Sequence, residues 1–398
     1  MIILTDKRDC CGCGACAQRC PKQCIALHED AEGFLYPVVN VASCIGCGLC
    51  EKVCPVINRG QTHEPLQVCA AKNRDTARRQ LSSSGGLFIA LAERVIAAGG
   101  VVFGVVFDER WEAHHVAAST WAELHPMMRS KYVQSRTEQT FREAENYLKA
   151  GREVLYAGTP CQIAGLRKFL RRDWPRLLTV ELICHGVPSP GVWRRYLSEL
   201  VTDGSEVAGV SFREKRRCGY DWKSYGFVVW ERRAYGPSSV GVKCSQPFGS
   251  NPFMRGFLSD IYLRPSCYAC PAKNGTSGAD LTIADYWGIG SVCPGFEDED
   301  GVGLAIVHTE RGRAAFSRCG FEVCLTTLEE AVRSNPAYVR SVTAPSSRAR
   351  FFNLLRRGVP VSRAVEACLR VPLWRRVVRR LRRAGRGFLT AVLRQAAV

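Results

Sequence analysis

The sequence predicts a mixed α/β (α+β) protein in which a small cysteine-rich unit precedes a larger core. After residue 65, stretches with helical periodicity alternate with short β-branched runs, a pattern typical of a largely parallel or mixed sheet. Before residue 60, one cysteine-proline motif occurs twice. The 398 residues are 46% hydrophobic and 23% charged, an ordinary globular composition with room for two or three domains.

The repeated motif has the spacing C-x2-C-x2-C-x3-C-P, and its second copy follows the first by 34 residues. Bacterial ferredoxins with two 4Fe-4S clusters use this spacing, and the fourth cysteine of each run binds the other cluster. The predicted ligand sets are Cys10, Cys13 and Cys16 with Cys54, and Cys44, Cys47 and Cys50 with Cys20. Zinc is the alternative, although zinc sites pair C-x2-C units and seldom use such a run. Cys11 and Cys24 fall outside the pattern and are interpreted as bystanders.

Local periodicity predicts the elements of the core. Helices are expected at residues 87–98, 139–150 and 162–172. Strands are expected at residues 100–108, 153–157, 178–184, 207–212 and 225–232. A polar stretch with Gly and Pro at residues 59–65 is interpreted as a linker. The predicted domains are a dicluster ferredoxin-like domain (1–60), a core (61–365) and a basic amphipathic helix (366–398).

Four further cysteines are scattered along the core. Cys161 and Cys184 each lie at or just after the end of a predicted strand, and Cys267 and Cys270 form a C-x2-C pair in a proline-flanked loop. Because the carboxyl ends of neighbouring parallel strands meet at one edge of a sheet, these thiols can converge on a third 4Fe-4S cluster. Two alternatives stay open: two buried cysteines beside a redox or zinc C-x2-C pair, and a nucleophilic Cys161 activated by a helix N-terminus.

Residues 82–86 (SSSGG) come just before the first predicted core helix. Hydroxyl groups, free N–H groups and close backbone approach at a helix N-terminus can hold a phosphate. A serine N-cap explains the same residues. Lys131 and Tyr132 offer a cation beside an aromatic ring, which suits a pyrophosphate or a planar ring but is also common on protein surfaces.

From Cys10 to about residue 365 the sequence resembles the beta-subunit family of coenzyme F420 hydrogenases and dehydrogenases, in the bacterial version with a dicluster ferredoxin domain in front. The matching motifs are SSSGGL (82–87), SKYVQS (130–135), GTPCQIAGL (158–166), ELICHGVPSP (181–190), SFREKRRCGY (211–220), MRGFLSDIYLRPSCYACPAK (254–273) and IADYWGI (283–289). Arg129 departs from the family pattern, in which a small residue is expected before SKYVQS.

Members of this family are iron-sulfur flavoproteins. The resemblance implies that a core 4Fe-4S cluster is bound by Cys161, Cys184, Cys267 and Cys270. It also implies that an FAD site includes Ser84, Gly85, Gly86, Lys131, Tyr132 and Gln134. The flavin-binding core would then receive electrons from, or return them to, the two N-terminal 4Fe-4S clusters.

The function that the resemblance implies is that of an iron-sulfur flavoprotein oxidoreductase, acting on an organic substrate or a deazaflavin. His185, beside Cys184, is a candidate proton donor, with a structural histidine as the alternative. A second hypothesis is an electron-transfer subunit that serves a partner enzyme and has no substrate of its own. Either role needs a redox partner, a ferredoxin-like donor or a partner enzyme. A third hypothesis is a basic zinc-cysteine protein that binds nucleic acid, although no recognition motif supports it.

The cysteine count bears on the compartment. Twenty-one cysteines in a small secreted protein would suggest disulfides, but this chain is long and the count is odd. The first nine residues contain no apolar signal region. The sequence therefore predicts a protein of the reducing cytoplasm whose cysteines serve as metal ligands.

The last 28 residues contain eight arginines and no acidic residue, and their apolar residues recur on one helical face. A basic amphipathic helix of this kind can lie on an anionic membrane surface. Peripheral contact with the inner membrane surface is one hypothesis for this segment. Docking on the protein body or on the acidic face of a partner is the other.

Overall fold

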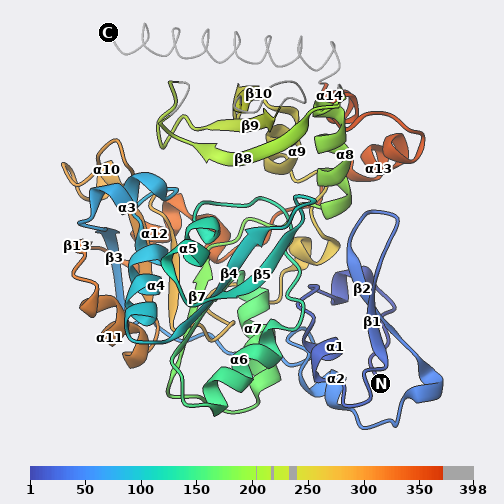
Figure 1. The fold of residues 1–398 in the computed structure, drawn as a ribbon, viewed down its shortest axis with the longest axis horizontal. Coiled ribbons are helices and arrows are strands. Elements are labelled where there is room, and N and C mark those ends of the chain that lie inside the picture. The colour runs from blue at the N-terminus through green and yellow to red at the C-terminus, as the bar shows by residue number, and fades with distance from the viewer. Residues whose placement is uncertain (203, 217–218, 233–239, 371–398) are drawn as a thin grey trace, which may run out of the picture.

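The core is built on one eight-stranded sheet (Figure 1). The computed structural model describes residues 1–202, 204–216, 219–232 and 240–370. The strand order is β13-β3-β12-β11-β7-β6-β4-β5. The strands are β3 (Gln67–Lys72), β4 (Val101–Phe107), β5 (Ala113–Ala118), β6 (Val154–Gly158), β7 (Leu177–Leu182), β11 (Leu281–Asp285), β12 (Gly303–Val307) and β13 (Glu322–Leu325). Strands β4, β6, β7 and β11 are parallel and the outer pairings are antiparallel, so the sheet is mixed and the predicted fold class is confirmed.

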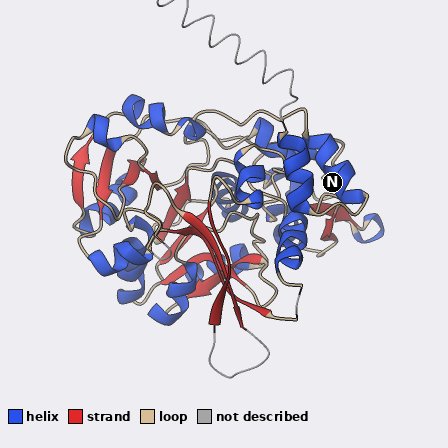
Figure 2. Ribbon diagram, turned by 90° about the horizontal axis from the view of Figure 1, so that it is seen from above, coloured by secondary structure: helices blue, strands red, loops and turns tan. Residues whose placement is uncertain are grey.

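Helices cover both faces of this sheet, and Figure 2 shows the strands with helices around them. Phe103 and Tyr156 pack with α6 (Thr140–Lys149) and α7 (Pro160–Leu170), whereas Val102 packs with α4 (Leu87–Ala97) on the opposite face. Burial on both faces explains why the predicted strand at residues 100–108 is apolar throughout. The other helices along this sheet are α3 (Thr76–Leu81), α5 (Trp121–Leu124), α10 (Ile289–Val292), α11 (Glu310–Arg318) and α12 (Leu328–Ser334).

A second sheet is antiparallel, with the order β10-β9-β8, and lies above the first in Figure 1. It consists of β8 (Glu206–Glu214), β9 (Gly226–Arg232) and β10 (Val240–Pro247), and it packs with α8 (Pro190–Leu200), α9 (Pro252–Leu258), α13 (Arg348–Arg356) and α14 (Val361–Leu369). Its core is aromatic: the Trp193 ring lies 5.0 Å from that of Phe212 and 5.1 Å from that of Phe253. Phe107, at the end of β4, lies 6.2 Å from Phe212. The second sheet therefore stands at the carboxyl edge of the first.

The N-terminal unit packs on α6 and α7. It contains α1 (Ala15–Arg19), α2 (Leu49–Lys52) and the β1 (Ile25–Glu29) and β2 (Leu35–Val39) ribbon. The Gln18 side chain donates to Thr137 Oγ1 at 3.1 Å and accepts from the Phe141 backbone N–H at 2.9 Å. The segment predicted as a linker has no helix or strand, and its Gly60 lies directly against the Thr276 carbonyl.

The predicted helices and strands of the core are present with small shifts at their ends. One predicted domain boundary, at residue 366, falls inside α14. The predicted basic helix that follows lies almost entirely outside the described residues, which end at Arg370. Among the residues described, no helix is long and apolar enough to cross a membrane.

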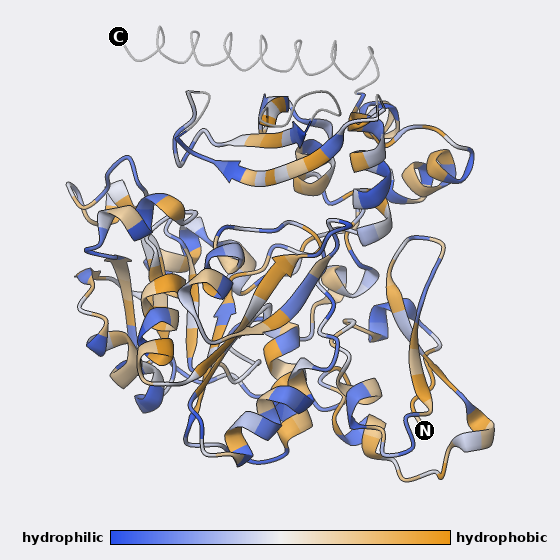
Figure 3. Cartoon of the chain, in the orientation of Figure 1, coloured by the Kyte–Doolittle hydropathy of each residue, from blue (hydrophilic) through white to orange (hydrophobic). Residues whose placement is uncertain are grey.

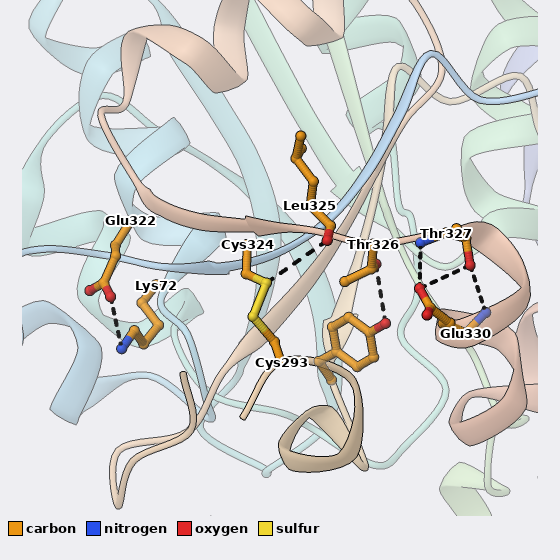
Figure 4. Close-up of a disulfide and its surroundings, with 9 residues drawn as sticks. Lys72, Cys293, Glu322, Cys324, Leu325, Thr326, Thr327 and Glu330 are labelled. Carbon is orange, nitrogen blue, oxygen red and sulfur yellow. Dashed lines mark hydrogen bonds and ion pairs between the residues drawn. A yellow bond between two sulfur atoms is a disulfide. The ribbon is translucent and has the colours of Figure 1, made fainter. Parts of the chain in front are cut away.

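A disulfide joins Cys293 to Cys324, with 6.8 Å between their Cα atoms (Figure 4). Cys293 follows α10 and Cys324 lies on the edge strand β13, so the bond fastens the loop after α10 to the sheet. The prediction that the cysteines serve as metal ligands is therefore wrong for these two. The pair is 31 residues apart in the sequence, and no local pattern indicates that they meet.

Gly85 lies where two strands leave no space for a side chain. A Cβ there would lie 2.6 Å from the Ala71 carbonyl oxygen and would also collide with the Gly303 backbone. We expect Gly85→Ala to lower the free energy of unfolding by about 1 to 3 kcal/mol, because the strands must move apart. Chemical denaturation measures this change. The control is Gly241→Ala in β10, where an added Cβ meets nothing within 4 Å; equal stability of the two variants would contradict the packing argument.

Candidate iron-sulfur and flavin sites

The core cysteines gather at the carboxyl edge of the parallel strands. Cys161 lies in the first turn of α7, where Thr159 and Gln162 form a capping box. Cys184 comes two residues after β7, and Cys267 and Cys270 belong to the short turn η4 (Pro265–Ala269) and its C-cap. Two neighbouring parallel strands and one distant loop thus bring four thiols to the edge where α/β proteins place their sites.

These four thiols influence one another. Burial, opposed by Lys273 and supported by the Cys161 and Cys270 thiols, raises the pKa of Cys184 to about 12. Burial likewise raises the pKa of Cys267, with Cys184, Cys161 and Cys270 as additional causes. Thiols in this setting stay protonated unless a metal group compensates the charge of the thiolates, and metal binding then releases the protons.

The surroundings of the four thiols fit an anionic cluster. The Val187 N–H donates to Cys267 Sγ at 3.4 Å, and Thr159 Oγ1 lies 3.3 Å from Cys161 Sγ. The Lys273 ammonium donates to the Cys184 carbonyl at 2.7 Å, which places a positive charge beside the set. Hydrogen bonds to the sulfurs and nearby charge are the means by which proteins stabilise and tune 4Fe-4S clusters.

The structure speaks against a nucleophilic Cys161. The Cys11 thiol and then burial raise the Cys161 pKa well above its ordinary value. An activated nucleophile needs a lowered pKa, because the thiolate is the reactive form.

The first N-terminal set lies against α7. Burial raises the pKa of Cys16 to about 12, with the Cys10 and Cys54 thiols as further causes. Gly165 of α7 makes the close approach possible, since a Cβ there would lie 2.9 Å from Cys13 Sγ. The first cluster set therefore rests on the same helix that begins at Cys161.

The second N-terminal set surrounds a small apolar pocket farther from the core. The cysteines that line it are Cys20, Cys24, Cys44, Cys47 and Cys50. The Ile2 N–H donates to Cys50 Sγ at 3.3 Å, while Cys47 is exposed. Cys24, interpreted from the sequence as a bystander, lies 3.3 Å from Cys20, sulfur to sulfur.

Across the described residues, no three Cys, His, Asp or Glu side chains are close enough together to hold a metal ion. Each cysteine set is therefore identified by its neighbouring thiols and by the hydrogen-bond donors that lie near their sulfur atoms.

Cys11 links the first N-terminal set to the core set. It is 5% exposed, and its thiol interacts with those of Cys13 and Cys161. The Cys13 contact raises its pKa, the Cys161 contact lowers it, and burial raises it. The sequence motif left Cys11 without a role, because its neighbour Cys161 is 150 residues away.

The SSSGG turn and the SKYVQS segment meet. Ser130 N–H donates to Ser83 Oγ at 3.1 Å, and the two hydroxyls are also 3.1 Å apart. Ser84 is buried, and Gly86, with φ at +73°, precedes α4 without a side-chain cap. The serine N-cap alternative therefore does not describe the start of α4.

Lys131 and Tyr132 continue this site, whereas Gln134 does not. The Lys131 ammonium donates only to carbonyls, with Met128 O at 3.1 Å, and no carboxylate in the described part of the chain pairs with it. The Tyr132 ring lies 4.9 Å from Phe257 and 5.8 Å from Phe212. Gln134 instead donates to the Cys11 carbonyl at 3.1 Å, so it belongs to the contact with the N-terminal unit.

Buried charges at the end of β8 and directly after it lie near the turn, and the sequence analysis gave them no role. Glu214 accepts from Arg129 at 2.8 Å, and Lys215 donates to the Arg79 and Asp300 carbonyls at 3.0 and 2.7 Å. Arg213 pairs with Asp285, and its guanidinium lies over Trp287. The signal available in the sequence was a run of charged residues directly after the predicted strand at residues 207–212, a composition that is unusual for buried residues. Arg129, the departure from the family pattern, supplies the partner of Glu214.

His185 lies near the same aromatic residues. Its Nε2 is 2.6 Å from Asp260 Oδ1, and its ring meets Phe257 edge-on at 5.4 Å. Phe257 thus contacts both His185 and Tyr132. A carboxylate that orients an imidazole is compatible with the predicted proton donor and with a structural histidine.

Comparison with protein families assigns two parts of the chain. Residues 151–331 match the family model for the C terminus of the coenzyme F420 hydrogenase/dehydrogenase beta subunit. Residues 9–58 match a 4Fe-4S dicluster domain. The chain joins these two domains. The first of these matches contains all four core cysteines, and the dicluster domain contains both N-terminal sets. The chain is thus an iron-sulfur protein related to a hydrogenase/dehydrogenase subunit, an oxidoreductase family.

Solved structures include 13 matching chains. One belongs to the F420-reducing [NiFe] hydrogenase complex from Methanosarcina barkeri, at 18% identity and a TM-score of 0.44, over 76% of this chain and 91% of that chain. No curated protein matches the chain.

Replacement of both Cys267 and Cys270 by Ser tests the core set. We expect anaerobically reconstituted protein to lose about four irons per chain, because one cubane loses two of its ligands. Iron and sulfide analysis measures the loss. Cys319→Ser, which changes a cysteine at the end of α11, is the matched control. Iron content equal to that of the control would exclude a cluster at this set.

Proposed function

We propose that this protein is an iron-sulfur flavoprotein oxidoreductase that moves electrons between three 4Fe-4S clusters and FAD. The observation that carries the proposal is the environment of Cys11, whose thiol interacts with Cys13 of the first N-terminal set and with Cys161 of the core set. When bound, the clusters would exchange single electrons and the flavin would convert them to two-electron chemistry. The chain supplies the positions, the exclusion of water and the local charges.

The three cysteine sets follow one another from the surface of the N-terminal unit to the sheet edge of the core. The second N-terminal set opens to the surface at Cys47, beside the exposed side chains of Val41 and Ile45. In Figure 3 the segment between β2 and α2, at the lower right of the molecule, includes hydrophobic residues drawn in orange. The first N-terminal set lies inward on α7, and the core set lies at the sheet edge. An external redox partner would therefore exchange electrons at the Cys47 loop.

The flavin end of the path is proposed at the SSSGG turn. The N-terminus of α4, which has no side-chain cap, and the Lys131 ammonium, which pairs with no carboxylate among the described residues, favour an anionic group such as a pyrophosphate. The stacked rings of Trp222 and Trp287, 5.2 Å apart, and the ring of Tyr132 offer flat apolar surfaces. His185 is the proposed proton donor to a substrate at the flavin, held in orientation by Asp260. The substrate itself would be a small organic molecule or a deazaflavin.

A second candidate is an electron-transfer subunit without a substrate of its own, because the exposed Cys47 loop favours a protein partner. Anaerobic assays distinguish the two: a flavin that turns over with small acceptors supports the enzyme, and turnover that requires a second protein supports the electron-transfer role. The proposed compartment in both cases is a reducing cytoplasm, where cluster thiolates persist.

Lys131→Ala tests the flavin site. We expect protein with full iron content and little bound FAD, because the variant loses the cation that faces the dinucleotide without disturbing the cysteine sets. Flavin and iron are measured on the same sample. Lys149→Ala removes an exposed lysine paired with Glu145 and is the control. Native flavin content in the Lys131 variant would remove this residue from the site.

Flavin affinity should also depend on pH. Burial, and then the Arg129 charge, lower the pKa of Lys131 to about 7. A bound pyrophosphate favours the ammonium and raises this pKa, so affinity is highest below about pH 7 and falls as the pH rises through it, by up to tenfold per unit. Titrations of FAD from about pH 6 to about pH 9 measure the trend. Lys131→Arg keeps its charge over this range and should give a flatter profile; identical profiles would contradict the assignment.

A further inference from the structure

Arg264 is a buried cation without a carboxylate partner. It is 1% exposed, and among the described residues no ion pair includes it. The interior is an unfavourable place for an uncompensated charge, because water no longer solvates it. Its surroundings must therefore supply negative charge or a complete set of hydrogen-bond acceptors.

The guanidinium faces the first cysteine of the N-terminal motif. Nε donates to the Cys10 carbonyl at 2.7 Å, and Nη2 lies 3.5 Å from Cys10 Sγ and 2.9 Å from the Leu35 carbonyl. Nη1 donates to Gln134 Oε1 at 3.0 Å, and the Tyr36 ring lies 4.2 Å from the guanidinium carbon. Of these partners, only the Cys10 sulfur becomes an anion when a cluster binds.

The backbone of Arg264 belongs to the core set. Its N–H donates to the Val187 carbonyl at 3.0 Å, and its carbonyl accepts from the Cys267 N–H at 2.9 Å. Val187 in turn donates to Cys267 Sγ. The side chain of Arg264 thus contacts Cys10 of the first N-terminal set. Its backbone contacts the turn that carries Cys267 of the core set.

Gln134 completes this contact. It accepts from Arg264 and donates to the Cys11 carbonyl at 3.1 Å, so the carbonyls of Cys10 and Cys11 are each held by one of the two side chains. The Cys10–Cys11 backbone is therefore fixed directly against the core.

We propose that Arg264 is a positioning and tuning residue for the cluster held by Cys10, Cys13, Cys16 and Cys54. Reduction adds one electron, and hence one negative charge, to the cluster. The guanidinium favours the more negative state and raises the reduction potential. It also holds this cluster at a constant separation from the core cysteines. The inference rests on the iron-sulfur part of the proposed function and does not depend on the flavin.

A redox titration monitored by electron paramagnetic resonance tests this role in the full, anaerobically reconstituted chain. We expect Arg264→Gln to keep its iron and to shift one cluster to lower potential, by at least a tenfold change in its reduction equilibrium, about 59 mV for a one-electron couple. Arg264→Lys retains a charge and should recover part of the shift. Unchanged potentials in an iron-loaded Arg264→Gln protein would overturn the proposal.

Arg142→Gln is the matched control. Arg142 also crosses to the N-terminal unit, where it donates to the Gln18 and Cys20 carbonyls, and it has no hydrogen bond to a thiol. This variant should leave the potential of the cluster at the Cys10 set at its native value. A shift equal to that of Arg264→Gln would assign the effect to the interface in general and would overturn the specific role.

A second variant covers the case in which Arg264→Gln does not take up iron. Gln134→Glu leaves Arg264 in place and sets a carboxylate against its guanidinium, which neutralises its charge. The same cluster should shift to lower potential, and a native potential would overturn the proposal. If the unaltered chain holds no cluster at the Cys10 set, the proposed function itself fails. This outcome is distinguishable from failure of the Arg264 proposal, because it is observed before any variants are compared.

Discussion

The packing of residues 10–16 against the first turns of α7 is the contact on which the proposed electron path depends. Cys11 reaches Cys161 across this contact, and Gly165 leaves the space that Cys13 occupies. Gln18 closes the same surface by hydrogen bonds to Thr137 and Phe141. Because these groups are buried and hydrogen-bonded, turning the N-terminal unit away from the core would break these bonds and expose apolar surface of the contact. The separation of the two cysteine sets is thereby a property of the fold.

Charge is the second constraint on this arrangement. Buried thiols keep their protons, and their pKa values are raised accordingly, at Cys16 and Cys184 to about 12. A cluster reverses this preference because it binds thiolates. The structure then supplies compensation at the same places: Lys273 beside Cys184, the Val187 N–H at Cys267 and the Arg264 guanidinium at Cys10. The donors and cations match the sulfurs that would become negative.

Local patterns in the sequence predict much of this architecture. The β-branched run at β4 and the helical spacing at α4 and α6 follow from burial, and the ferredoxin spacing groups eight cysteines without any knowledge of the fold. The four core cysteines can be predicted from the sequence because two of them lie at strand ends that a parallel sheet brings together. In each case the information lies within a few residues, or follows from a general rule of topology.

What the sequence did not indicate depends on distant partners. Arg264 acts on Cys10, more than 250 residues before it, and its own neighbours look like an ordinary loop. Gln134 was assigned to the flavin through its motif, yet its side chain holds the Cys11 carbonyl. Gly85 was interpreted as part of a phosphate cradle, whereas the Ala71 and Gly303 backbones already require a glycine there. The Cys293–Cys324 disulfide likewise joins two loop and edge positions that share no local signal.

Magnetic interaction between clusters tests the central claim, a fixed first N-terminal cluster beside the core cluster, most directly. Fully reduced, reconstituted protein should give a broadened electron paramagnetic resonance spectrum in which the core cluster interacts with its N-terminal neighbour. The variant without the Cys267 and Cys270 thiols should give the simpler spectrum of the two N-terminal clusters alone. A spectrum of the unaltered protein that equals the sum of three independent clusters, or that is identical in the variant, would contradict the account.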